Sequence, residues 1–338
     1  MTLMNKIFTA LSVPSTVSSI LKKLSTQRSF LQKNIQPILS DAEKQNDGSL
    51  DAADFSKIND YYGLAVPAIL GEAFCALHNK TMSADERIAS TSQGAMTGLF
   101  DDFFDKQYLS DDMIEDMLND KDVPGKKSNE KLFDVFYKNA LKHVPDKKKM
   151  QEALTEVYQA QLESKKQTQD SISEKEIQSI TFYKGGTSLL FYRTAFLPVP
   201  SIEEEKLIYN LGSLMQLAND IFDVYKDREN KIKTLVTETK HIATVRELFQ
   251  ELLSTYYLVA YDIGFPKKNV RKFLSILSLG IFSRAFVCLD QLEKNEATTN
   301  HVFSVHQYSR KELICDMDTV SNKLNSTSYH IKILNAEF

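Results

Sequence analysis

The chain has 338 residues, of which 42% are hydrophobic and 25% are charged, and its formal net charge at pH 7 is -4. This composition is that of an ordinary globular protein, and it excludes a fibrous or largely disordered chain. The acidic balance argues against a nucleic-acid-binding protein, because no basic face large enough to neutralise many phosphates is apparent. A small phosphorylated ligand needs only a local cationic site, so this class of ligand is not excluded.

The cysteines Cys75, Cys288 and Cys315 are odd in number and far apart in the sequence. They therefore predict neither a disulfide framework nor a zinc site, and a cytoplasmic location is the simplest expectation. No apolar run reaches the roughly 18 residues that a transmembrane helix needs, so no such helix is expected.

Residues 1–40 contain no acidic residue and are rich in Ser and Thr. They carry five basic residues, which are Lys6, Lys22, Lys23, Arg28 and Lys33. This pattern is typical of a transit peptide or of a segment that binds weakly to membrane surfaces. An ordinary surface helix is the simpler explanation, so we assign this segment no role and leave peripheral membrane contact open.

Apolar residues recur at helical spacing along nearly the whole chain, and glycine and proline are few, at 11 and 8 residues. The expected helices are residues 16–39, 52–79, 84–107, 110–119, 128–143, 146–168, 174–197, 202–227, 240–262, 267–292 and 300–324. Ser83 and Glu86 form a capping box at the start of the third helix, and Pro145 and Pro200 mark helix boundaries. We therefore predict an all-α fold with one domain over residues 41–338, a bundle of roughly ten to twelve helices.

An acidic cluster, with the sequence DDFFD at residues 101–105, ends the third helix. Asp101 and Asp105 share one helix face, where two like charges destabilise the helix unless a cation lies between them. A solvated, frayed helix end is the alternative, but the flanking residues are apolar and unpaired buried carboxylates are costly, which favours metal binding. Small residues precede the cluster on the same side, and we expect them to line a cavity: Gly94, Thr97 and Gly98.

A second acidic face lies much further along the chain. Asn219, Asp223 and Asp227 are spaced four residues apart and form one ridge of oxygen atoms, which Gly212 and Gln216 continue in the N-terminal direction. Magnesium takes oxygen ligands and couples one or two carboxylates to substrate phosphates. An amphipathic helix with an acidic outer face is the alternative, although apolar residues flank the acids. Two such ridges facing each other would form a diphosphate clamp.

Together these motifs resemble those of the class I isoprenoid synthase superfamily, which contains polyprenyl diphosphate synthases, head-to-head squalene and phytoene synthases, and class I terpene synthases. The first resembles the family's DDxxD motif, in which the matching residues are Asp101, Asp102 and Asp105. The second is similar to the GxxxQxxDDxxD segment of polyprenyl synthases through Asn219, Asp220 and Asp223. It is also similar to the NDxxSxxxE triad of terpene synthases through Asn219, Asp223 and Asp227, with Lys226 before the final acid.

A third window, residues 183–191, is similar to the KTGxLF segment of polyprenyl synthases, whose lysine contacts the allylic diphosphate. Lys184 occupies that position, beside Gly185 and Gly186. A glycine pair within a helix lets the backbone loosen and approach a phosphate. An exposed lysine at a helix kink is the alternative.

The departures from the family favour one branch of it. Chain-elongating synthases carry basic clusters that hold isopentenyl diphosphate, an RRGxP sequence after the first motif and a GKxxRP sequence near the start. Here residues 106–109 read KQYL, and neither cluster is present. Without a second diphosphate site, a reaction of a single substrate is favoured over elongation.

Weaker candidates for contact with the diphosphate come from the C-terminal part of the chain. Arg284 lies in an otherwise apolar helix, where we expect it to meet an anion or a carboxylate. Tyr308 and Arg310 resemble, in reversed order, the Arg-Tyr pair that terpene synthases place at the mouth of their cavity. Five aromatic residues are candidates for the wall around a carbocation, although each is more often plain core: Phe74, Phe100, Phe104, Phe191 and Tyr192.

The resemblance implies the class I isoprenoid synthase fold, with helices around a central cavity, and a magnesium-dependent terpene synthase that ionises an isoprenyl diphosphate. It implies Mg²⁺, as three ions that Mn²⁺ can replace, held by the acids of both motifs, while Lys184, Lys226 and the C-terminal cations donate to the diphosphate. The alternatives are a prenyltransferase, including a head-to-head synthase, and a non-catalytic protein that binds isoprenoid diphosphates. The oligomeric state, monomer or homodimer, stays open.

Overall fold

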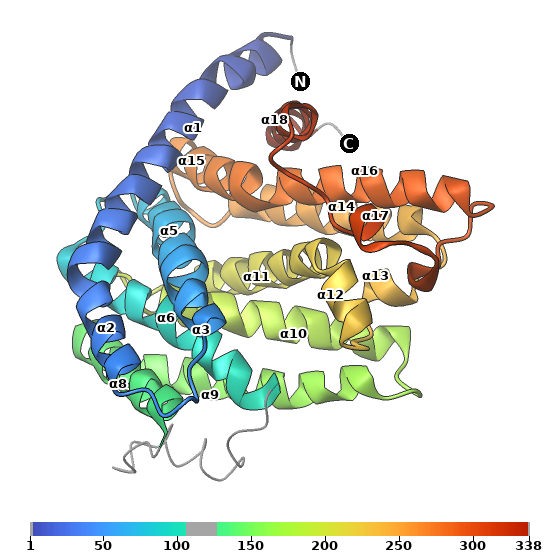
Figure 1. Ribbon diagram of the computed structural model, residues 1–338. Coiled ribbons are helices and arrows are strands. Elements are labelled where there is room, and N and C mark those ends of the chain that lie inside the picture. The colour runs from blue at the N-terminus through green and yellow to red at the C-terminus, as the bar shows by residue number, and fades with distance from the viewer. Residues whose placement is uncertain (1–2, 106–126, 337–338) are drawn as a thin grey trace. The chain divides into compact units, whose positions relative to one another are not determined.

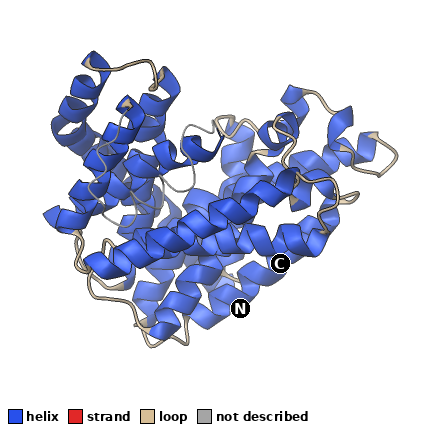
Figure 2. Cartoon of the chain, turned by 90° about the horizontal axis from the view of Figure 1, so that it is seen from below, coloured by secondary structure: helices blue, strands red, loops and turns tan. Residues whose placement is uncertain are grey.

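The computed structural model describes residues 3–105 and 127–336, and within them the side chains of residues 3–8, 101, 102, 104 and 105 are not described. The described residues form helices and loops without a strand (Figure 2), which confirms the predicted all-α fold. They group into two compact units. The N-terminal unit comprises Ser18–Gln161 and Leu190–Pro200, and the C-terminal unit comprises Met1–Val17, Leu162–Leu189 and Ser201–Phe338. The predicted domain division after residue 40 and the central cavity stay predictions.

The N-terminal unit is built from the helices that precede and follow the first acidic motif. Their bounds are α1 (Leu3–Phe30), η1 (Leu31–Ile35), α2 (Gln36–Lys44), α3 (Ala52–Ser56), η2 (Lys57–Tyr62), α4 (Gly63–Ala65), η3 (Val66–Gly71), α5 (Glu72–Leu77), α6 (Ala84–Asp105), α8 (Ser128–His143) and α9 (Lys147–Ser164). The predicted capping box of α6 is confirmed, because the Ser83 N–H donates to the Glu86 carboxylate at 2.9 Å and the Glu86 N–H to the Ser83 hydroxyl at 3.2 Å. The predicted helix 110–119 falls outside the described residues.

Aromatic packing between α6 and α8 forms the core of this unit. Phe133 of α8 stacks on Phe100 of α6 with ring centroids 5.8 Å apart, and on Tyr137 at 6.2 Å. Aromatic pairs at such distances contribute about 0.5–1.5 kcal/mol beyond the burial of their area. Four of the five proposed aromatic wall residues are buried in this unit, while Phe104 lies outside the described side chains: Phe74, Phe100, Phe191 and Tyr192.

The two glycines of the small-residue face of α6 are covered by η2, and the expected cavity beside this face stays a prediction. A Cβ atom on Gly94 would lie 2.5 Å from the Tyr62 carbonyl oxygen, and one on Gly98 would lie 3.1 Å from the Lys57 side chain. Gly94 and Gly98 therefore serve the close packing of α6 against η2, whereas the Thr97 hydroxyl accepts from the Tyr192 hydroxyl at 3.0 Å. Sequence spacing could not show which residues cover this face.

The C-terminal unit contains the second acidic motif. Its further elements are η4 (Lys165–Thr168), α10 (Glu174–Arg193), α11 (Ile202–Phe222), α12 (Val224–Glu229), α13 (Leu235–Glu238), α14 (Ile242–Ala260), α15 (Lys267–Leu277), η5 (Ser278–Phe282), α16 (Ser283–Thr298), η6 (Val305–Gln307), α17 (Arg310–Leu313) and α18 (Val320–Leu334). α11 packs against α14 and α16, and α16 also packs against α18 (Figure 1). α11 therefore lies in the interior of the unit.

The continuous run from α15 through α16, Lys267–Thr298, is long and apolar enough to cross a membrane by length and composition. It is the one such helix among the described residues, and 67% of its most apolar window is buried inside the protein. A core helix has the same composition, and the packing of α16 against α11, α14 and α18 accounts for its apolar character.

The prediction of one helix over residues 300–324 is wrong. The structure has the short helices η6 and α17 in this segment, followed by α18. Ser309 and Glu312 form a capping box at α17, and the Thr319 hydroxyl accepts from the Asn322 N–H at 3.2 Å at the start of α18. These local hydrogen bonds begin new helices where the apolar spacing alone suggested a continuous one. The first helix also starts earlier than predicted, at Leu3.

His330 of α18 should make the stability of the protein depend on pH. It is fully buried, its Nδ1 lies 2.9 Å from the Ser278 hydroxyl, and burial lowers its pKa from 6.5 to about 4. Between these values the unfolded chain binds more protons than the folded one, so stability decreases as the pH falls from 6.5 to about 4. We expect a loss of about 2 kcal/mol over this window, reduced in His330→Gln, as measured by urea unfolding at each pH. Equal pH profiles of the two proteins would contradict this assignment.

Candidate functional site

The site begins where α10 and α11 cross in direct backbone contact. A Cβ atom on Gly185 would lie 2.2 Å from the Gly212 carbonyl oxygen, and one on Gly212 would lie 2.3 Å from the Gly185 carbonyl oxygen. Only glycine at both positions allows this approach. α10 continues as a helix through Gly185 and Gly186, so the expected loosening of the backbone is not found. The glycine pair instead brings the two helices together.

Asp220 lies next to this crossing and is buried at 4% exposure. Its carboxylate accepts hydrogen bonds from the Thr181 hydroxyl of α10 at 3.1 Å and from the Gln216 amide of α11 at 2.9 Å. Burial raises its pKa to about 6, while these two hydrogen bonds act in the opposite direction. The assignment of Asp220 as a metal ligand stays a prediction, and the structure gives it a second role in joining α11 to α10.

The predicted ridge of Asn219, Asp223 and Asp227 keeps its helical register, although the helix is not continuous. α11 ends at Phe222 and α12 begins at Val224, yet the Asp223 N–H donates to the Asn219 carbonyl at 2.8 Å. The Asp227 N–H donates to the Asp223 carbonyl at the same distance, 2.8 Å. The Asn219 amide also donates to the Asp223 carboxylate at 3.4 Å. Asn219, Asp223 and Asp227 therefore follow one another along the ridge, as the sequence spacing predicts.

Asp227 has the most perturbed carboxyl group of the ridge. It is 8% exposed, and burial, followed by the charges of Asp220 and Asp223, raises its pKa from 3.8 to about 8. Lys226 and Lys184 act in the opposite direction. Burial is the largest of these causes, and a cation bound beside Asp227 would favour its carboxylate form.

Two of the predicted diphosphate-binding cations lie near these acids. Lys184 of α10 is half-buried and interacts electrostatically with Asp220 and Asp227. Lys226 of α12 is exposed and interacts with Asp227. The structure therefore brings Lys184 and the second acidic motif together from separate helices, as expected if they serve one site.

Three arginine guanidinium groups lie over aromatic rings beside the ridge. The Arg284 guanidinium lies 6.0 Å from the ring centroid of Phe222, the residue before Asp223. Arg310 and Arg228 lie 5.7 Å and 4.9 Å from the ring centroid of Tyr225. Arg284 is exposed, so the expectation that it meets a carboxylate in an apolar interior is not supported by its surroundings. Its position beside Phe222 remains compatible with contact to an anion.

Sequence reasoning missed Arg228, which fastens the C-terminal segment to α12. Its guanidinium donates to the Tyr308 carbonyl at 2.6 Å and to the Val305 carbonyl at 3.3 Å. Tyr308 itself is buried, and its hydroxyl lies 2.6 Å from the Thr299 hydroxyl. Its predicted contact with diphosphate stays a prediction. A charged residue directly after a proposed ligand was the available signal for Arg228.

The side chains of Asp101, Asp102 and Asp105 lie outside the described residues, so the predicted clamp between the two motifs stays a prediction. Among the side chains that are described, no group of three or more His, Cys, Asp or Glu residues could by itself hold a metal ion. A metal ion on the second motif would therefore need further oxygen ligands. The Asn219 amide oxygen and the phosphate oxygens of a substrate are of the right kind.

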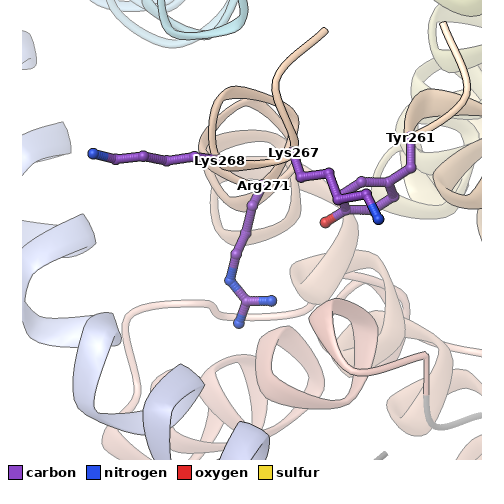
Figure 3. A pocket seen from close by; sticks show the side chains of 4 residues that line it. All are labelled: Tyr261, Lys267, Lys268 and Arg271. Atoms are coloured by element: carbon purple, nitrogen blue, oxygen red, sulfur yellow. The ribbon is translucent and has the colours of Figure 1, made fainter. Parts of the chain in front are cut away.

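An open hollow of about 440 Å³ lies elsewhere in the C-terminal unit, between the end of α14 and the start of α15 (Figure 3). Its lining residues are Tyr261, Lys267, Lys268 and Arg271. None of the predicted site residues lines this hollow. We therefore assign the candidate site from side-chain chemistry.

Comparisons with known proteins add one structural similarity. No family model matches the chain, and no curated protein matches it. Among solved structures, the chain is similar to a crystal structure of a dehydrosqualene synthase in complex with ligand, with 13% sequence identity and a TM-score of 0.47. The match covers 95% of this chain and 99% of that chain. At these values the similarity assigns no family. The described residues themselves define an all-α fold in which an acidic ridge lies beside Lys184.

Proposed function

We propose that the protein is a magnesium-dependent class I terpene synthase, a lyase that ionises one allylic isoprenyl diphosphate. The observation that carries this proposal is the grouping of Lys184 with Asp220 and Asp227 at the crossing of α10 and α11. Carboxylates that raise one another's pKa favour a cation, while the nearby lysine favours an anion. A metal diphosphate satisfies both requirements.

The residues of the ridge fit magnesium by their chemistry. Asp223, Asp227 and the Asn219 amide supply hard oxygen atoms along one helix face, and the raised pKa of Asp227 falls when a cation is bound beside it. Magnesium, when bound, stabilises the negative charge that develops on the departing diphosphate. Asp101, Asp102 and Asp105 would complete the set from the first motif.

The cations of the chain would bind and orient the diphosphate. Lys184 contributes a point charge from α10, and Lys226 contributes a second from α12. Arg284 and Arg310 lie on the aromatic rings that flank Asp223, where they can reach an anion held by the ridge. Fixed donors aimed at a developing charge are effective because little reorganisation is needed during the reaction.

The reaction is tested by incubating purified protein with single allylic diphosphates of increasing chain length, with and without labelled isopentenyl diphosphate. We expect inorganic diphosphate and a hydrocarbon or alcohol to form, only when magnesium or manganese is present. Label in a longer prenyl diphosphate, or joining of two substrate molecules, would contradict the proposal and identify a prenyltransferase. Tight binding of the diphosphate without any product would identify the non-catalytic alternative.

Replacing Lys184 by alanine should weaken substrate binding. A hydrogen bond to a charged group contributes about 1.5–3 kcal/mol, so we expect the Michaelis constant to rise by roughly 10- to 100-fold. Lys175→Ala is the matched control, because Lys175 is exposed on the same helix. Steady-state kinetics with both variants distinguishes the two positions. An unchanged Michaelis constant and rate in Lys184→Ala would place this lysine outside the site.

A further inference from the structure

Two of the three cysteines meet in the structure, although they lie far apart in the sequence. Cys288 lies on α16, on the same helix face as Gln291 and Asn295. The Gln291 amide donates to the Glu312 and Ile314 carbonyl oxygens at 2.5 and 3.2 Å, and the Asn295 amide donates to the Glu312 carbonyl at 2.9 Å. These bonds hold the end of α17 and the residue after it against this face of α16. Cys315 follows Ile314 directly and lies beside Cys288.

The two thiols are neighbours in different surroundings. The Cys288 thiol is buried at 4% exposure beside the Cys315 sulfur, whereas the Cys315 thiol also lies 3.9 Å from the Met317 sulfur. The hydrogen bond between the two cysteines lowers the pKa of Cys315 and, with burial, raises that of Cys288. The Asn322 amide also donates to the Cys315 sulfur, at 3.6 Å, and Cys315 is partly exposed. Cys315 is thus the thiol that more readily becomes a thiolate, and Cys288 is the protonated thiol beside it.

Cys75 provides an internal contrast. It belongs to the N-terminal unit, is 1% exposed, and burial raises its pKa to about 12. A buried thiol of this kind reacts slowly with oxidants, because the thiolate is the nucleophile and access is required. Reactivity should therefore differ sharply among the three cysteines of one chain.

We propose that Cys288 and Cys315 are a peroxide-sensitive dithiol, which a hydroperoxide oxidises to an intramolecular disulfide. The Cys315 thiolate attacks one oxygen of the peroxide, the O–O bond breaks, and a sulfenic acid and one molecule of water or alcohol result. The Cys288 sulfur then attacks the Cys315 sulfur, the S–O bond breaks, and a second molecule of water carries away the Cys288 proton. The two sulfur atoms together lose two electrons, and the peroxide gains them.

The disulfide would link α16 covalently to the segment that bears Arg310. This segment, residues 305–315, also contacts α12 through the hydrogen bonds of Arg228 to Val305 and Tyr308. Oxidation therefore ties the segment at one end to α16, while Arg228 holds it to the acidic ridge at the other. The proposal stands on the thiol pair and is independent of the proposed enzymatic activity.

The test is oxidation of the purified full-length protein with a small molar excess of hydrogen peroxide, followed by non-reducing tryptic peptide mapping. Trypsin separates the two cysteines into peptides 285–294 and 312–323, because it cleaves after Arg284, Lys294, Lys311 and Lys323. We expect these peptides to be recovered joined within one chain, lighter by two hydrogen atoms than the two free peptides together, while Cys75 keeps a free thiol. Met317 lies on the second peptide, so methionine oxidation is scored separately.

Three variants distinguish the roles of the thiols. In Cys288→Ser, the sulfenic acid on Cys315 has no neighbouring thiol with which to form a disulfide. It should therefore accumulate and be trapped as an adduct with dimedone. In Cys315→Ser, neither the linked peptide nor a dimedone adduct should form, whereas Cys75→Ser should behave like the wild type. Recovery of both peptides unlinked, faster oxidation of Cys75, or links between chains only would overturn the proposal. Hydrogen exchange of residues 305–315 should also become slower in the oxidised wild type and stay unchanged in Cys315→Ser.

Discussion

We expect Asp227→Asn to make the protein more stable above neutral pH while it removes most of the activity. The folded protein keeps a proton on Asp227 that the unfolded chain releases, because burial and two neighbouring carboxylates raise its pKa from 3.8 to about 8. The wild-type protein therefore loses stability as the pH rises from 3.8 to about 8, because the unfolded chain releases this proton more readily than the folded protein does. The neutral amide removes that cost, and at pH 7.5 the gain should be about 2–4 kcal/mol.

The measurement is urea unfolding of both proteins without magnesium, from pH 4 to pH 8. The difference should become small near pH 4, where the carboxyl group is protonated in the folded protein and about 40% protonated in the unfolded chain. Turnover with magnesium should fall on the order of 100- to 1,000-fold, because one charge-stabilising ligand is lost. A variant less stable than the wild type at pH 7.5 would contradict the electrostatic argument. Glu251→Gln, at an exposed position of α14, is the control.

Gly212→Ala should destabilise the crossing of α10 and α11 by about 3 kcal/mol or more, at the upper end of the range for overpacked cores. The added Cβ atom would meet the Gly185 carbonyl oxygen at 2.3 Å, and backbone cannot rotate away as a side chain can. Alanine has the higher helix propensity, so the intrinsic preference of the helix opposes this effect. A loss of stability therefore measures the contact between the two helices.

Lys206→Ala, at an exposed position of the same helix, is the matched control and should change stability by less than about 0.5 kcal/mol. Thermal and urea unfolding of both variants provide the comparison. Because the crossing also positions Thr181 against Asp220, activity at a permissive temperature should fall as well. A Gly212→Ala protein as stable as the wild type would show that the helices can separate without cost.

Much of the helical layout was predictable, because helices such as α8 and α14 have apolar stripes and clear ends. The bounds of α8, Ser128–His143, agree with the predicted ones. Residues 300–324 were not predictable from apolar spacing, because local capping bonds at Ser309 and Thr319 decide where helices begin there. Contacts between segments that are distant in the sequence were not predictable for a different reason. Sequence spacing says nothing about which helix covers a face, as Gly94 and the meeting of Cys288 with Cys315 demonstrate.

Within the candidate site, spacing predicted the ridge of Asn219, Asp223 and Asp227, because neighbours four residues apart must share a helix face. Its relation to Lys184 was an expectation from family resemblance, and the structure brings these groups together in one unit. The hydrogen bonds that Thr181 and Arg228 make could not be predicted from the sequence. They depend on how separate segments approach each other, and single-sequence patterns do not carry that information.

The break between α11 and α12 divides the ridge into two parts with different supports. The part that bears Asn219 belongs to a long helix fixed by the Gly185–Gly212 contact, whereas Asp227 lies on a six-residue helix whose own Arg228 binds the C-terminal segment. Asp223 lies between the two helices, where it caps the end of α11 and the start of α12. The distance between the proposed oxygen ligands at the two ends of the ridge therefore depends on residues 305–310, of which Val305 and Tyr308 are buried. A change in that remote segment should alter the ridge without touching any of its acids.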